Sequence, residues 1–83
     1  MNLSRVLKDI DMGRVGLNAD DTIRTIGMFL DPARKPDYDD TVRVLIDASW
    51  AMELRPGGEH TRLLRLTTIG EIKLIQGAEQ VTV

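Results

Sequence analysis

Three aspartates stand close together in the segment DYDD, at Asp37, Asp39 and Asp40. Carboxylates at this spacing can hold a divalent metal or act as an acid–base pair, but the segment lacks the glycine and the distal glutamate of a calcium loop. It also lies where a helical pattern begins, and aspartate is a preferred residue at a helix N-terminus. We therefore expect Asp37 to cap a helix, and we expect no metal site.

Other side-chain chemistry is sparse. His60, the one histidine, lies in a glycine-rich turn with no carboxylate or serine at a spacing that indicates a catalytic relay. The chain has no cysteine, which removes disulfides, thiolate metal sites and cysteine nucleophiles. We expect no catalytic residues, no cofactor and no enzyme.

Composition narrows the class of protein. A chain of 83 residues with 42% hydrophobic content makes one domain with a modest core, so a homodimer is a natural source of extra stability. The net charge of -2 argues against a surface that is basic throughout, although local basic patches remain possible. No apolar run approaches the roughly 18 residues of a membrane span, and the N-terminus lacks signal-peptide order. We expect a soluble cytoplasmic protein.

Hydrophobic periodicity predicts three helices in the first part of the chain. Apolar spacing indicates helices over about 2–12, 20–30 and 38–49, with a brief strand or extended connector at 14–17 between the first two. Asn18 or Asp20 can cap the second helix. The residue before Pro32 disfavours helical geometry, so the second helix should end there.

A different pattern follows the third helix. Alternating residues and a glycine-rich turn predict a β-hairpin over about 51–67. Thr68 and Glu71 have the spacing of a capping box, so a fourth helix should run over about 68–76. Gly70 would let the first turn of that helix approach a neighbour closely. The tail 78–83 has no assigned role.

The segment TVRVLIDASWAMELRPGGEHTRLLRLTTIGEIKLI, residues 41–75, resembles the winged-helix segment of MarR-like and PadR-like regulators. The matching positions are Leu45 and 52–54 between helix and strand, Gly57 and Gly58 at the wing tip, and Leu66, Thr67 and Gly70 in the closing motif. This resemblance implies an α+β fold over 1–83: a winged helix-turn-helix with a three-helix core, a two-stranded β-hairpin wing and a C-terminal helix.

The resemblance also implies a small DNA-binding transcriptional regulator. Arg43 on the helix over 38–49 would enter the major groove of double-stranded DNA, while the preceding loop and the wing would contact phosphates. The cations in those two segments are Arg34, Lys35, Arg55, His60 and Arg62. An alternative is that these five are ordinary solvated surface residues.

A second function fits the same fold. At about 100° per residue, the outward face of the third helix carries Asp40, Arg43, Val44 and Asp47. Two negative charges against one positive would repel DNA but suit a basic protein surface, as in a phage-type inhibitor or adaptor. Met28 and Phe29 lie off the main stripe of the expected second helix, which either buries them on a second side or leaves them as a contact surface; a dimer interface would explain them.

Overall fold

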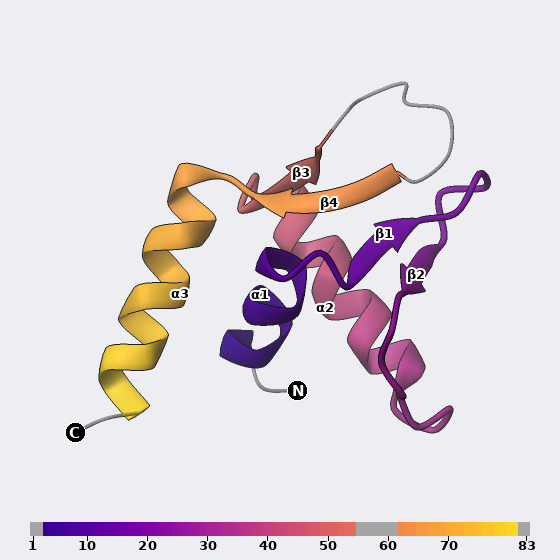
Figure 1. Cartoon of the computed structure of the whole chain (residues 1–83), viewed down its shortest axis with the longest axis horizontal. Helices are drawn as coiled ribbons and strands as arrows, with labels where there is room; N and C mark the ends of the chain where they lie inside the picture. The colour runs from indigo at the N-terminus through magenta and orange to yellow at the C-terminus, as the bar shows by residue number, and fades with distance from the viewer. Residues whose placement is uncertain (1–2, 55–61, 82–83) are drawn as a thin grey trace.

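The computed structural model describes residues 3–54 and 62–81 and shows a small α+β fold (Figure 1). Over these residues the chain forms three helices and four strands, which make one antiparallel sheet in the order β2-β1-β4-β3. The elements are α1 (Leu3–Asp11), β1 (Val15–Leu17), β2 (Ile23–Thr25), α2 (Lys35–Asp47), β3 (Ala51–Glu53), β4 (Arg62–Leu66) and α3 (Thr68–Val81). None of the helices in the described part has the length and apolar character of a membrane span.

The first helix and the strand after it follow the sequence closely. The helix expected over 2–12 is α1, whose Val6, Leu7 and Ile10 are buried. Gly13 follows with φ 74°, a left-handed conformation that glycine adopts without strain, and its N–H bonds the carbonyl of Ile10. The connector at 14–17 is strand β1.

The prediction of a helix over 20–30 is wrong. The segment instead forms strand β2, which pairs with β1 in a hairpin closed by the turn 18–22, followed by a loop. Gly27 has φ 67°, which no right-handed helix accommodates. Ile and Thr are β-branched and stiff, so they favour a strand once β1 offers a partner, and this pairing outweighs the helical spacing of the isoleucines. The described residues before β3 therefore contain two helices, whereas the winged helix-turn-helix expectation placed three there.

The helix expected over 38–49 is α2, but it begins earlier. Arg34 occupies the N-cap without a side-chain cap bond, and Pro36 lies in the first turn, where its missing N–H costs nothing. Asp37 is therefore inside the helix, favourably placed in the first turn but not the cap we expected. After α2, Ser49 adopts φ 63° and the Trp50 N–H bonds the Leu45 carbonyl, which turns the chain into β3.

The hairpin expected over 51–67 is confirmed as β3 and β4, with Ala51 opposite Leu66. The cap of the next helix is Thr67 rather than Thr68: its Oγ1 accepts the Gly70 N–H at 3.2 Å and donates to the Ser49 carbonyl at 2.7 Å. A Cβ on Gly70 would overlap the carbonyl oxygen of Trp50, so the expected close approach is present. Helix α3 runs beyond the expected end at 76, to Val81.

One core lies between the sheet and the two N-terminal helices. Its fully buried members are Val6, Leu7, Ile10, Val15, Ile23, Tyr38, Val42, Leu45, Ala51, Leu64 and Leu66. Trp50 packs against this core while half-buried, and Lys73 Nζ lies 5.4 Å from its ring centroid.

A buried polar contact joins α1 to α2 within this core. The Tyr38 hydroxyl donates to Asp9 Oδ2 at 3.0 Å, and Asp9 is the buried charged residue of the described chain. Burial, and then the bond to the carboxylate, raise the pKa of Tyr38 well above its usual range. This contact fixes α2 against α1, so the opposite side of α2 faces outward.

Candidate interaction face on helix α2

The outward face of α2 contains the residues that the sequence placed there. Asp40, Arg43, Val44 and Asp47 are all exposed, while Tyr38, Val42 and Leu45 point into the core. Val44 is 63% exposed, with Asp40 one turn before it and Asp47 nearly one turn after it. We call Asp40, Val44 and Asp47 the acidic α2 face.

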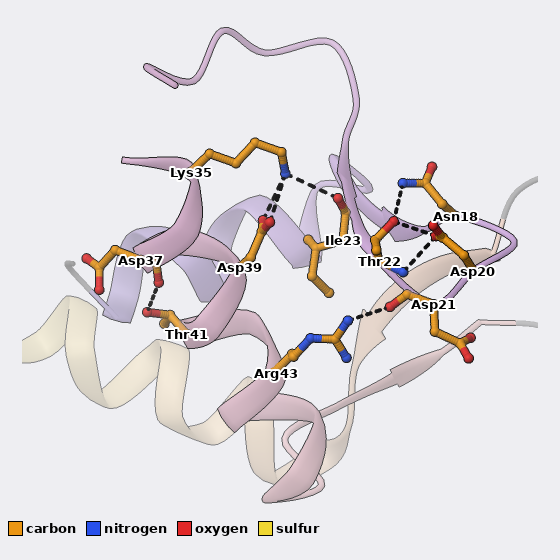
Figure 2. Close-up of polar contacts among 10 residues, drawn as sticks. All are labelled: Asn18, Asp20, Asp21, Thr22, Ile23, Lys35, Asp37, Asp39, Thr41 and Arg43. Atoms are coloured by element: carbon orange, nitrogen blue, oxygen red, sulfur yellow. Dashed lines mark hydrogen bonds and ion pairs between the residues drawn. The ribbon is translucent and has the colours of Figure 1, made fainter. Parts of the chain in front are cut away.

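Arg43 borders this face and is bonded within the molecule. Its Nη2 donates to the Asp21 carbonyl at 2.7 Å, which reaches from α2 to the β1–β2 turn (Figure 2). Asp21 has φ 68°, a left-handed conformation that aspartate tolerates better than most residues, and the turn thereby directs its carbonyl toward α2. The residue expected to read DNA bases thus contributes to holding a hairpin in place.

The β1–β2 turn is ordered by its own side chains. Asp20 Oδ1 accepts the Thr22 hydroxyl at 2.6 Å and the Thr22 N–H at 3.1 Å, and Asn18 Nδ2 donates to Thr22 Oγ1 at 2.8 Å (Figure 2). The Thr22 hydroxyl bond, and then the backbone bond, lower the pKa of Asp20. Asn18 and Asp20, expected to cap a helix, close this turn instead.

Lys35, in the first turn of α2, also bonds the first hairpin. Its Nζ lies 3.0 Å from both Asp39 carboxylate oxygens and 3.2 Å from the Ile23 carbonyl of β2 (Figure 2). The ammonium group therefore bonds a carbonyl of β2, an edge strand of the sheet, where another chain could otherwise pair. Lys35 and Arg43 together attach α2 to the first hairpin.

Arg62, the first residue of β4, makes more polar contacts than any other expected site residue that the structure describes. Its guanidinium binds the Glu53 carboxylate through two bonds, of 2.6 and 3.3 Å, and Nη1 donates to the Asn18 carbonyl at 3.0 Å. An ion pair of 2.5 Å to Asp21 Oδ1 completes the set. These contacts, Glu53 first, raise the pKa of Arg62, which stays fully charged.

Arg34 differs from these three cations. Its side chain is exposed and makes no hydrogen bond or ion pair with the described part of the chain. With Met28, Phe29 and Asp37 it lines a hollow of about 650 Å³ at the N-terminal end of α2. Met28 is half-buried against the core, whereas Phe29 is 87% exposed. Arg55 and His60 lie outside the described residues.

The residues expected to contact DNA therefore do not gather as one free positive surface. The described members point into intramolecular bonds at Lys35, Arg43 and Arg62, and Arg34 stands apart at the hollow. The sequence reasoning missed the acceptors of these bonds, Asp21 and Glu53. The run NADDT at 18–22 is rich in turn formers and was the available signal, but it was interpreted as a helix start.

Comparison with known proteins gives no relative: no family model matches the sequence, and searches of curated proteins and of solved structures find no match either.

Proposed function

We propose that this protein is an interaction module that binds a basic surface of a partner protein through the acidic α2 face, with Phe29 as a neighbouring apolar anchor. Asp40 and Asp47 supply negative charge on either side of Val44, which supplies a small apolar contact. Such a composition suits lysine and arginine side chains with long apolar stems. In this proposal the protein recognises a partner protein and catalyses no reaction.

The observation that carries this proposal is that most of the described basic residues expected to contact DNA are already bonded within the molecule. Three of the described basic residues expected to contact DNA are bonded to carboxylates or carbonyls of the same chain: Lys35 and Arg62, expected at phosphates, and Arg43, expected in the major groove. Binding to a phosphate backbone depends on cations that are free to replace its counterions. Releasing these three would break the attachment of the first hairpin, whereas the exposed carboxylates of α2 can bind without any rearrangement.

The position of Phe29 supports a protein partner rather than a small anion. Asp37 lies about 20° from Val44 around the helix axis, so the hollow that Asp37 and Phe29 line adjoins the N-terminal end of the acidic α2 face. An aromatic side chain left 87% exposed beside charged residues is a common anchor at protein interfaces. The two features together give a surface with an apolar end and an acidic centre.

A photo-crosslinking experiment tests the proposal. A photoreactive phenylalanine analogue replaces Val44 in cells that naturally express the protein, and the same analogue replaces exposed Lys8 on α1 as a positional control. We expect one protein to crosslink from position 44 and not from position 8. Asp40→Lys should abolish that crosslink, whereas Asp11→Lys, the same reversal on the exposed side of α1, should leave it intact.

A parallel measurement addresses DNA directly. Purified protein is titrated with random duplex DNA at low salt, where attraction to phosphates is strongest. Tight, salt-sensitive binding that Arg34→Ala weakens would overturn the proposal in favour of a DNA-binding regulator. Absence of a crosslinked protein at position 44 would also count against it.

A further inference from the structure

Helix α3 carries an apolar stripe on the side that faces away from the molecule. Ile69, Ile72 and Ile75 are 51%, 48% and 58% exposed. The opposite side of the helix, formed by Gly70, Leu74 and Gly77, is the one that meets the rest of the chain. Three half-exposed isoleucines on one helix face are unusual for an isolated monomer of this size. We call these three residues the isoleucine stripe.

We propose that the isoleucine stripe binds the same stripe of a second copy of this chain, giving a homodimer joined through α3. Because the three isoleucines share one helix face, a two-fold axis brings isoleucine against isoleucine. Like residues meet when the helices run in the same direction, and Ile69 meets Ile75 when they run in opposite directions. The stripe is therefore complementary to itself, as an isologous interface requires. The body of each subunit lies on the far side of its own α3, with α1 packed against the inner side of the helix, so the bodies do not obstruct this contact (Figure 1).

Charge beside the stripe selects the relative direction of the two helices. At about 100° per residue, Glu71 lies on one flank of Ile72 and Lys73 on the other, and both are exposed. If the two helices run in the same direction, two-fold symmetry places Glu71 of each copy opposite Lys73 of the other on both flanks. If they run in opposite directions, Glu71 meets Glu71 and Lys73 meets Lys73. The structure therefore favours helices that run in the same direction.

This dimer would present two acidic α2 faces, because α1 separates α2 from α3 in each copy (Figure 1). A bivalent molecule gains apparent affinity for a partner with repeated basic sites. The dimer itself is independent of the proposed function, since none of its contacts involves the acidic α2 face.

Sedimentation of the full chain over a wide micromolar concentration range tests the proposal. We expect a monomer–dimer equilibrium, and Ile72→Glu should weaken the dimer by about 100-fold or more because the charge is buried twice at the symmetry axis. Met52→Glu is the matched control: it also replaces an exposed apolar residue, on β3 instead of α3, and it should leave the dimer constant unchanged. A wild-type chain that stays monomeric throughout, or a dimer that Ile72→Glu does not weaken, would overturn the proposal.

A charge swap tests the direction of the helices and does not depend on the folding of Ile72→Glu. Glu71→Lys alone and Lys73→Glu alone should each weaken the dimer, since each creates like-charge pairs on both flanks. Lys73→Glu also removes the contact of Lys73 with the Trp50 ring, so urea unfolding of each variant is measured beside its dimer constant. The double variant should restore it, because the opposite pairs are rebuilt in reverse. Failure of the double variant to recover would reject the arrangement with both helices in the same direction.

Discussion

Helices α2 and α3 flank α1, are nearly the same length, and expose opposite kinds of surface (Figure 1). Helix α2 packs large side chains inward, among them Tyr38 and Leu45, and leaves charged residues outside. Helix α3 turns glycines inward and leaves isoleucines outside. One helix is held by filling the core, and the other by close backbone approach that uses little of its apolar surface.

This difference shows that residue type alone does not identify a binding surface. Whether an exposed side chain is already bonded within the molecule matters as well. Near α2, the cations Lys35 and Arg43 are bonded within the molecule, as Arg43 is to Asp21, while the acidic α2 face is exposed. On α3, no other part of the described chain covers the isoleucine stripe, and its three side chains stay about half-exposed. A polar group that is already bonded within the chain must break that bond to bind a ligand. Exposed apolar surface, in contrast, gains free energy when a partner covers it.

The largest effect should come from Gly70→Ala, which breaks the attachment of α3. The added methyl would overlap the Trp50 carbonyl oxygen, and that carbonyl is held in place because it accepts the Thr67 N–H at 3.0 Å. We expect a loss of about 3 kcal/mol in the free energy of unfolding, measured by urea denaturation.

Gly77→Ala is the matched control on the same side of α3. Its methyl would meet the side chain of Ser4 and no backbone carbonyl, and alanine favours the helix by about 1 kcal/mol over glycine. The variant should therefore be close to neutral. Equal losses in the two variants would show that the approach at Trp50 does not fix the helix.

The next effect concerns how α2 is held. Tyr38→Phe removes the donor to Asp9, which stays buried without that partner. The expected loss is about 1–3 kcal/mol in the free energy of unfolding, the usual range for an unsatisfied buried polar group. Thermal and urea unfolding measure it, and an unchanged stability would mean that water replaces the hydroxyl.

The same contact predicts a dependence on high pH. Folding raises the pKa of Tyr38, so the unfolded chain loses this proton first as pH rises above the ordinary tyrosine value of about 10. Stability from this group is complete below that pH and declines above it. Because Tyr38 is the one tyrosine in the chain, its absorbance reports its ionisation directly. Ionisation at the ordinary value in the folded protein would contradict the contact.

Some elements of this fold could be predicted from the sequence, and others could not. The helices α1 and α2 and the β3–β4 pair follow local periodicity, so they could be predicted within a few residues. Strand β2 could not, because its conformation depends on pairing with β1, which competes with helical spacing. The outward residues of α2 were also predictable from helix geometry. The bonds of Arg43 and Arg62 were not, because Asp21 and Glu53 reach them only through the fold.

A smaller effect should follow from Arg62→Gln, which sharpens the account of the β1–β2 turn. The variant loses the charged contacts to Glu53 and Asp21 but keeps a polar side chain. We expect faster amide hydrogen exchange at Asp21 and Thr22, with the midpoint of thermal unfolding changed by less than about 4 °C. Arg65→Gln, on the other face of β4, should leave exchange in the turn unchanged. Equal effects of both variants would remove the special role of Arg62.

The smallest effect should come from Lys35→Met, because its ion pair with Asp39 is partly exposed. The Lys35 side chain is 43% exposed and the pair spans one helical turn, so solvent screens much of the attraction. We expect a loss of no more than about 0.5 kcal/mol in the free energy of unfolding, and the loss should shrink further at high salt. Asp39→Asn and the double variant complete a cycle that isolates the pair from the separate bond to Ile23. If the cycle gives no coupling while Lys35→Met still loses stability, the carbonyl of the edge strand is the contact that matters, and Lys35 protects β2 rather than pairing with α2.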